Sequence, residues 1–428
     1  MDIKEKVITV GILLPQGEKW QVESSMEELV RLCETAGAQV VAEIIQKRTK
    51  PDPAYYIGKG KAEELAGLVI EKEANLVVVD EELSPSQTRN LEEVLDVRVI
   101  DRTALILDIF ARRARTREGK LQVELAQLNY LLPRLTGRGK ILSRLAGGIG
   151  TRGPGETKLE VDRRVIRKRI SDLNKEIESI KKQRALQRRA REKVPYPVVS
   201  LVGYTNAGKS TLLNALTDSY VFTEDKLFAT LDPTTRKIVI PGNQTILLTD
   251  TVGFIQKLPP HLVAAFRATL EEVQEADLLL HVVDFSHPDM EVQMMAVHEV
   301  MEDLGVTEKP IIFVFNKIDL INDPIALKRL KINYPESVAV SAKKGLNLEV
   351  LLEKIASMLK EDWKKVIFSI PFEDSRSLAL VHEKGDVLEI TPQDNSFLVE
   401  AQMTDKWISK LKDYVKKVYE EKGRSKLD

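Results

Sequence analysis

The stretch Gly203-Tyr204-Thr205-Asn206-Ala207-Gly208-Lys209-Ser210 decides the fold at the centre of this 428-residue chain. It fits the phosphate-loop pattern G-x-x-x-x-G-K-[ST], whose backbone N–H groups surround a di- or triphosphate. An apolar run, residues 198–202, precedes the stretch, and residues 211–216 follow it with a helical pattern. A strand, a glycine turn and a helix N-terminus aimed at the anion predict an α/β fold, a doubly wound sheet with this loop after its first strand.

A second run, Asn316-Lys317-Ile318-Asp319, indicates which nucleotide the loop binds, since a phosphate loop alone leaves ATP and GTP open. It follows the apolar run 311–315. A carboxylate at Asp319 can accept hydrogen bonds from the N1–H and 2-amino groups of guanine, and adenine has neither donor there. Ser341-Ala342-Lys343, after a further short apolar run, is expected to cap the base. The chain is therefore predicted to bind GTP and GDP.

Three oxygen-bearing side chains predict a Mg²⁺ site beside the phosphates. The Ser210 hydroxyl is the ligand typical of the loop, and Asp250, at the end of an apolar strand, is expected to hold the ion through water. Residues 228–236 lie between them, where a mobile switch segment belongs, and Thr230 is favoured there over Thr234 and Thr235 as the second hydroxyl ligand. The Gly253 N–H is placed to sense the γ-phosphate. The predicted nucleotide-binding residues are Gly203, Tyr204, Thr205, Asn206, Ala207, Gly208, Lys209, Ser210, Thr211, Phe228, Ala229, Thr230, Leu231, Asp232, Asp250, Thr251, Val252, Gly253, Asn316, Lys317, Ile318, Asp319, Ser341, Ala342 and Lys343.

Two positions bear on the reaction itself. Lys209 is expected to reach the β- and γ-phosphates, but Phe254 follows Gly253 where many switch GTPases carry a glutamine that orients the attacking water. Phenylalanine cannot do this, so we expect slow hydrolysis until a partner, another residue or an ion supplies the missing group. Asn206 has two interpretations that stay open: its side-chain oxygen ligates a monovalent cation such as K⁺, or it braces the loop through hydrogen bonds.

Composition fits a globular chain of several domains, 43% hydrophobic and 30% charged. No run of 18 apolar residues occurs, so no membrane span is expected. Cys33 is the single cysteine and is predicted to be a buried apolar residue. A reducing cytoplasmic setting fits this cysteine usage. We expect a monomer.

Four parts are expected along the chain. Residues 1–110 alternate strand and helix patterns and predict a small parallel α/β domain, in which Gly58 begins a turn into a helix rather than a phosphate loop. Residues 111–194 are helical, residues 195–362 form the nucleotide domain, and residues 363–428 form a small α+β module. The last helix of this module is placed at residues 405–415.

The helical part is strongly basic, although the chain as a whole carries a net charge of −1. Residues 111–193 contain 24 Lys and Arg against nine Asp and Glu, a net charge of +15. Two apolar stripes at helical spacing, Leu121 to Leu132 and Ile166 to Ile180, predict an antiparallel helical hairpin. Its glycine-rich tip loop, residues 135–157, is predicted to contact RNA. A solvated helical surface and a plain linker are the alternatives. The predicted RNA-binding residues are Arg138, Lys140, Arg144, Arg152 and Lys158.

Three segments resemble the HflX family of ribosome-associated GTPases, within the Obg-HflX superfamily. They are FATLDPT at residues 228–234, GTRGPGETKLE at residues 150–160 and YIGKGKAEEL at residues 56–65. The resemblance implies a GTPase that binds the 50S ribosomal subunit and its 23S rRNA, with the helical arm reaching toward the peptidyl transferase centre. It also implies a role in splitting stalled or idle 70S ribosomes under stress such as heat, and it agrees with Phe254 in place of glutamine.

Two other functions stay open from the sequence. A ribosome-assembly GTPase would bind 50S precursors rather than mature 70S ribosomes. A non-ribosomal RNA-binding regulator would use nucleotide binding for stability and turn over little GTP. A third idea, that residues 1–110 form a separate nucleotide-binding enzyme, has no catalytic group of residues to support it.

Overall fold

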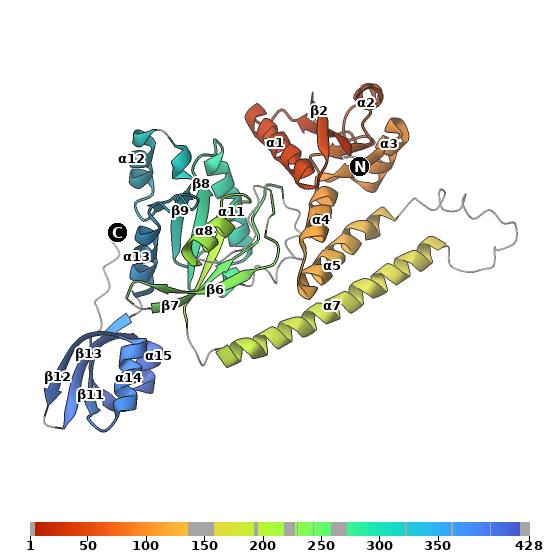
Figure 1. Ribbon diagram of the computed structural model, residues 1–428. Coiled ribbons are helices and arrows are strands. Elements are labelled where there is room, and N and C mark those ends of the chain that lie inside the picture. Colours follow the sequence, from red (N-terminus) through yellow and green to blue (C-terminus); the bar gives the residue numbers. More distant parts are fainter. Residues whose placement is uncertain are drawn as a thin grey trace.

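The computed structural model describes residues 5–135, 158–191, 196–217, 227–228, 230–242, 244–257, 272–321, 323–360, 363–393 and 395–419. Three sheets and a helical arm make up this part of the chain (Figure 1). Among the described helices, none combines the length and the apolar character needed to cross a membrane.

The N-terminal domain is a four-stranded sheet with helices on both faces. Its strand order is β2-β1-β3-β4 and all pairs are parallel, as predicted. Helices α2 and α3 cover one face and α1 and α4 the other. The elements are β1(Lys6–Leu13), α1(Lys19–Thr35), β2(Gln39–Lys47), α2(Lys59–Lys72), β3(Leu76–Val79), α3(Pro85–Leu95), β4(Arg98–Asp101) and α4(Arg102–Arg113).

Local sequence explains most of these boundaries. Ser84 and Gln87 form a capping box at the start of α3, where Pro85 needs no N–H partner. Gly58 is the N-cap of α2, which confirms the predicted turn into a helix. Helix α4 was not expected, and it runs across residue 110. Cys33 is fully buried in α1, as predicted.

The nucleotide domain is a six-stranded doubly wound sheet with the order β10-β9-β8-β5-β7-β6. Only the β6–β7 pair is antiparallel; the other pairs of this sheet are parallel. The phosphate loop follows β5 in the middle of the sheet, as the sequence predicts. The elements are β5(Val198–Gly203), α8(Lys209–Thr217), β6(Thr234–Ile240), β7(Gln244–Asp250), β8(Leu278–Asp284), α11(Met290–Asp303), β9(Ile311–Asn316), the 3-10 helix η1(Ile318–Leu320), α12(Pro324–Asn333), β10(Val338–Ala339) and α13(Leu348–Lys360).

Two long helices, α5(Arg117–Arg134) and α7(Lys158–Arg191), form the arm. They lie side by side in Figure 1, and their apolar stripes meet in a small cluster of Leu121, Leu173 and Ile177. The expected helical hairpin packing is therefore present. Two hydrogen bonds from Arg169 to Glu124, 2.7 and 2.8 Å long, add a charged contact between the helices.

The C-terminal module has the βαββαβ order of a ferredoxin-like fold, with antiparallel strands ordered β12-β13-β11-β14. The predicted helix over residues 405–415 is wrong beyond Lys410. A strand starts at Val415, because the pattern Val-Lys-Lys-Val-Tyr alternates and pairs with β11. The elements are β11(Trp363–Pro371), α14(Ser375–Lys384), β12(Asp386–Gln393), β13(Ser396–Thr404), α15(Asp405–Lys410), the 3-10 helix η2(Lys412–Tyr414) and β14(Val415–Tyr419).

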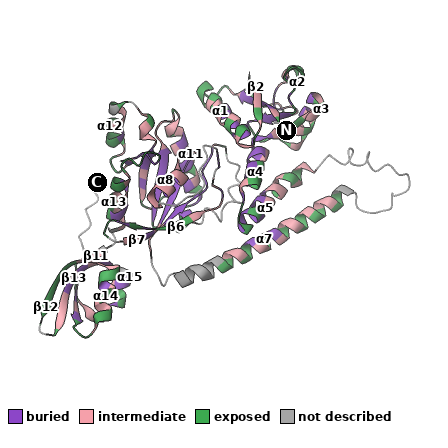
Figure 2. Cartoon of the chain, in the orientation of Figure 1, coloured by how far each residue is buried: buried purple, intermediate pink, exposed green. Residues whose placement is uncertain are grey.

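Burial separates the sheets from the arm (Figure 2). The inner strands β1, β3, β5 and β8 are mostly buried, while the described side chains of α7 are mostly exposed or half-buried, apart from Leu173 and Ile177. One hydrophobic core joins two domains, since Phe110 of α4 packs edge-on against Phe228, with 4.6 Å between ring centroids. The N-terminal domain therefore packs directly on the segment expected to be a switch.

Candidate functional site: a nucleotide pocket joined to two neighbouring domains

The phosphate loop takes a conformation that only glycine allows at two positions. Gly203 has φ +149° and Gly208 has φ +93°, and a Cβ on either would come within 2.2 Å of a neighbouring atom, Val282 O or Asn316 Nδ2. The loop wraps back on itself, and the Lys209 ammonium donates to the carbonyls of Gly203 and Tyr204 at 3.0 and 2.8 Å. Burial lowers the pKa of Lys209 to about 8, against the opposing charge of Asp250.

Three oxygen donors meet at the start of α8. Ser210 Oγ lies 2.6 Å from Asp250 Oδ2 and 2.7 Å from Thr230 Oγ1. Asp250 is fully buried, and its Oδ1 accepts no hydrogen bond from the described residues. Burial raises the pKa of Asp250, while Lys209 and the two hydroxyls oppose the rise. Hard oxygen donors with a spare buried carboxylate oxygen fit Mg²⁺.

The other two threonines of the expected switch lie elsewhere. Thr234 and Thr235 belong to β6, and Thr235 exchanges a hydrogen bond with Thr249 on β7 at 3.0 Å. Of these three threonines, Thr230 is the one beside Ser210, in agreement with the preference drawn from the sequence.

The two base-recognition runs are brought together around Asn316. Its amide donates to Ala207 O at 2.9 Å and accepts from Ala342 N at 3.0 Å, so it ties the phosphate loop to the Ser341-Ala342-Lys343 run. Asp319 accepts from the Ser341 hydroxyl at 2.6 Å, which orients its carboxylate. A carboxylate oriented in this way fits the N1–H and 2-amino edge of guanine.

Phe254 is buried, and its backbone is fixed to the phosphate loop. Its carbonyl accepts from Thr205 N at 2.7 Å and its N–H donates to Gly203 O at 3.1 Å. The ring is 3% exposed and belongs to the core shared with the N-terminal domain. It therefore cannot orient a water molecule. Gly253 is required beside it, because a Cβ there would lie 2.7 Å from Thr205 Cα and 3.0 Å from Lys209 Nζ.

Some predicted residues are not at the pocket. The Asp232 carboxylate lies on α5, where it accepts from the backbone N–H groups of Arg115 and Thr116. Ala229 lies outside the described residues, as do the predicted RNA-binding residues Arg138, Lys140, Arg144 and Arg152. Lys158 is the first residue of α7.

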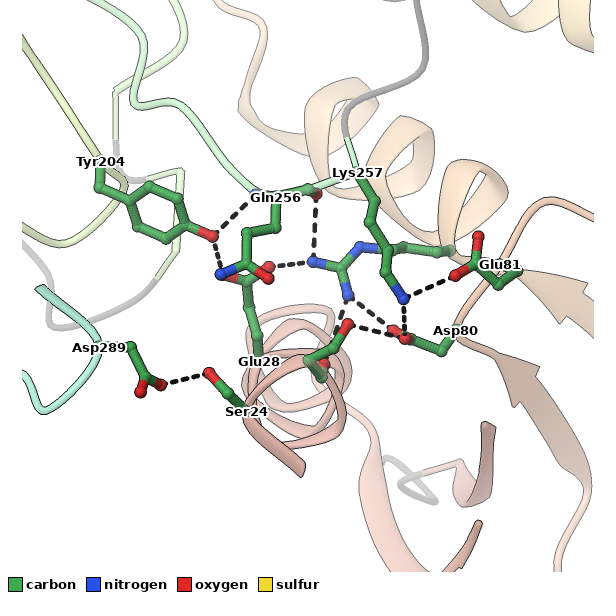
Figure 3. A network of polar contacts seen from close by, with 10 residues as sticks. Ser24, Glu28, Asp80, Glu81, Tyr204, Gln256, Lys257 and Asp289 are labelled. Carbon is green, nitrogen blue, oxygen red and sulfur yellow. Dashed lines mark hydrogen bonds and ion pairs between the residues drawn. The ribbon is translucent and has the colours of Figure 1, made fainter. Parts of the chain in front are cut away.

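A buried polar cluster, which we call the Arg102 cluster, connects the N-terminal domain to the pocket (Figure 3). Arg102 is 2% exposed; it pairs with Glu28 of α1 and with Asp80 at 2.8 Å, and it donates to Gln256 O at 3.4 Å. Tyr204 of the phosphate loop donates to Glu28 and accepts from Gln256 N at 2.7 Å. The cluster consists of Ser25, Glu28, Asp80, Arg102, Tyr204, Gln256 and Lys257.

Lys257 closes the cluster from the nucleotide domain. Its ammonium lies 2.6 Å from Asp80 and 2.7 Å from Glu81. Burial raises the pKa of Glu28 despite the nearby Arg102 charge. Burial opposes the charge of Arg102, but Glu28 and Asp80 outweigh it and raise the pKa of the guanidinium. The buried charges are thus compensated by each other.

Sequence reasoning missed the Arg102 cluster. Asp80 directly follows β3 and Asp101 ends β4, and polar side chains at the carboxyl ends of parallel strands commonly belong to functional sites. The placement of these aspartates directly after apolar strands is the sequence feature that could have indicated the cluster. Tyr204 and Lys257, which complete the cluster, lie more than 100 residues further along the chain than Arg102.

The doubly wound sheet, the phosphate loop and the Asn316–Asp319 run define a P-loop GTPase. Family models agree, with "GTP-binding GTPase N-terminal" at residues 23–111, "GTP-binding GTPase Middle Region" at 113–191 and "50S ribosome-binding GTPase" at 198–317. The chain is 50% identical over 412 residues to GTPase HflX of Caldanaerobacter subterraneus subsp. tengcongensis, covering 96% of this chain and 94% of that one. It is 44% identical over 376 residues to GTPase HflX of Escherichia coli, covering 88% of each. The chain belongs to the HflX family of GTPases, and it is a GTP hydrolase with a ribosome-binding GTPase domain.

Among solved structures, the chain is similar to a GTP-binding protein of Sulfolobus solfataricus in complex with GDP. The two are 28% identical, the match covers 83% of this chain and 99% of that chain, and the TM-score is 0.44.

Proposed function

We propose that the protein binds the 50S subunit and 70S ribosomes and uses GTP binding and hydrolysis to split the ribosome into subunits. The observation that carries the proposal is the pairing of this GTPase pocket with a basic arm. Among the described side chains of α7, residues 160–183, several basic ones are exposed, and a surface of this charge suits the phosphate backbone of ribosomal RNA. The exposed basic residues of α7 are Arg164, Arg167, Lys168, Lys175 and Lys182.

The pocket residues take separate roles in this proposal. Lys209 stabilises the phosphates, and Asp319 with Asn316 selects guanine. Ser210 and Thr230 would hold Mg²⁺ directly, and Asp250 would hold it through water. The ion, when bound, neutralises charge on the β- and γ-phosphates. Since Phe254 is buried, the group that activates water comes from outside the residues that form this pocket, and the ribosome is the candidate source.

GTP turnover with purified 50S and 70S particles, together with sedimentation of 70S ribosomes, tests this function. We expect turnover to rise by at least about tenfold over the protein alone and 70S to separate into 50S and 30S. Stimulation by 50S precursors without 70S splitting would identify an assembly factor instead. No stimulation and no splitting would overturn the proposal.

Deletion of residues 147–155 tests the function of the tip loop independently of nucleotide binding. The variant should keep its GDP affinity, measured by fluorescent-nucleotide titration, and should lose 70S splitting. Splitting at the wild-type rate would mean that the tip loop is only a linker.

A monovalent cation is proposed for Asn206, which adopts φ +61° in the phosphate loop and lines a small cavity of about 30 Å³ with Glu28 and Asp284. Hydrolysis should be faster in KCl than in NaCl of equal concentration, and Asn206→Ala should remove the difference. Equal rates in the two salts would leave Asn206 as a structural brace.

A further inference from the structure

The N-terminus of the arm helix α5 is hydrogen-bonded to Asp232, a residue of the nucleotide domain. Thr116 is the N-cap of α5 and accepts from the Gly119 N–H at 2.9 Å. Asp232 adds a second cap from outside the helix, because its Oδ2 accepts from the N–H groups of Arg115 and Thr116, both at 2.9 Å. The Thr116 hydroxyl in turn donates to Asp232 Oδ1. One carboxylate therefore holds the N-cap residue of α5 and the residue before it.

Asp232 lies two residues after Thr230, whose hydroxyl is 2.7 Å from Ser210 Oγ. Two residues of extended chain span at most about 7 Å. Leu231 between them is 4% exposed and belongs to the core that also contains Phe110 and Val123. The link is therefore short, and a movement of Thr230 that pulls Leu231 out of the core moves Asp232 as well.

The lack of a side chain at Gly119 makes room for the Asp232 carboxylate. A Cβ at this position would lie 2.4 Å from Asp232 Oδ1 and 3.1 Å from Thr116 Oγ1. Glycine is an unfavourable residue inside a helix, and alanine would strengthen α5 by itself. In contrast, Gly67 in α2 has nothing within 4 Å of its missing Cβ. The close approach of Asp232 thus requires the glycine at residue 119.

We propose that Asp232 is the joint through which the nucleotide controls the arm. With GTP, Thr230 is held at the metal site beside Ser210, and Asp232 stays on the first turn of α5. When Thr230 leaves after hydrolysis, Asp232 leaves too, and the arm is free to change its angle to the nucleotide domain. The inference rests on the proposed role of Thr230. Because coupling is reciprocal, RNA that fixes α5 also favours GTP at the pocket.

Hydrogen exchange of the Arg115 and Thr116 amides tests the joint without any ribosome. Their exchange in the full-length protein with a non-hydrolysable GTP analogue should be at least about fivefold slower than with GDP, the lower limit of ordinary allosteric coupling. Asp232→Ala and Gly119→Ala should both reduce this ratio to below about twofold. Gly67→Ala, the matched control, should keep the wild-type ratio.

Two outcomes would overturn the proposed role of Asp232. One is equal protection of the Arg115 and Thr116 amides with both nucleotides in the wild type. The other is a wild-type ratio of the two exchange rates in Gly119→Ala. Titration with each nucleotide, run in parallel, separates this from failure of the proposed site. Gly119 contacts Asp232 on the α5 side, away from the phosphate loop, so Gly119→Ala must bind GDP normally for its exchange to count. If the wild type shows no preference for GTP analogue plus Mg²⁺ over the same analogue without Mg²⁺, the assignment of Thr230 fails first.

Discussion

The nucleotide domain meets its neighbours through two polar contacts of opposite character. The Arg102 cluster is buried, with Arg102 at 2% and Asp80 at 3% side-chain exposure, and it joins the domain to α1 and β3. The Asp232 contact with Arg115 and Thr116 is exposed to solvent and joins the domain to the arm. Both start from segments next to the phosphates.

The difference indicates which contact is fixed and which can open. Breaking a buried ion pair leaves an unpaired charge without water, at a cost of about 3–5 kcal/mol. An exposed cap loses far less, because water replaces the protein partner. We therefore expect the Arg102 cluster to hold the N-terminal domain in place as an anchor through the GTPase cycle, and the Asp232 contact to open in each turnover.

Removing the central cation of the anchor should have the largest effect. In Arg102→Met, Glu28 and Asp80 remain buried, and we expect the free energy of unfolding to fall by about 3–5 kcal/mol. Urea unfolding followed by the fluorescence of Trp20, on α1, measures it, in a background where Trp363 and Trp407 of the C-terminal module are replaced by Phe. Arg98→Met, an exposed position 3.7 Å from Glu5, is the control and should change nothing measurable. A loss below about 1 kcal/mol in Arg102→Met would mean that the anchor is not fixed.

The comparison assumes that burial sets how much a charged group contributes to stability. His281, which belongs to neither contact, allows this assumption to be tested. Burial, aided by Lys209, lowers the pKa of His281 from 6.5 to about 3. Between these two pKa values the unfolded chain binds a proton at His281 and the folded chain does not. The free energy of unfolding therefore falls as the pH falls from 6.5 toward 3. Between pH 7 and pH 5 the loss should be about 2 kcal/mol.

Native-state hydrogen exchange of the β8 amides, corrected for intrinsic rates, measures this pH slope. His281→Phe should flatten it, while His382→Phe, at an exposed position on α14, should leave it unchanged. Identical slopes in the wild type and His281→Phe would show that the imidazole does not control the pH response.

A milder change to the anchor is Tyr204→Phe, which deletes one hydroxyl. Glu28 then loses a donor and Gln256 N loses its acceptor, so we expect a loss of about 1–3 kcal/mol. Exchange of the Gln256 amide should accelerate accordingly. Tyr196→Phe, whose hydroxyl accepts only an exposed bond from Lys237 at 3.2 Å, is the control. Unchanged Gln256 exchange would contradict the link between the phosphate loop and the anchor.

The smallest change in stability is expected for the arm contact. Asp232→Ala should lower the free energy of unfolding by less than about 1 kcal/mol, as for an exposed cap. Urea unfolding under the conditions used for Arg102→Met gives the comparison. A loss of about 3 kcal/mol would place Asp232 with the fixed contacts and argue against a joint that opens.

Much of the pocket could be predicted from the sequence because each motif acts within one short segment. The Gly203–Ser210 loop needs two glycines at fixed spacing, and its strand and helix follow from local patterns. Thr230 was favoured over two nearby threonines for the same local reason. The final strand β14 and helix α4 were missed, since short segments of mixed pattern obtain their structure from the neighbours they pack on.

The sequence by itself determined the class of nucleotide, the lack of a water-orienting glutamine at Phe254 and the basic charge of the arm, and it predicted the oxygen donors for Mg²⁺. Only the tertiary structure decided that Glu28 binds both Arg102 and the Tyr204 hydroxyl, and that Asp232 turns to α5 instead of the phosphates. These contacts join residues 74 to 176 positions apart. No local pattern encodes them, because they exist only once separately folded cores have packed together.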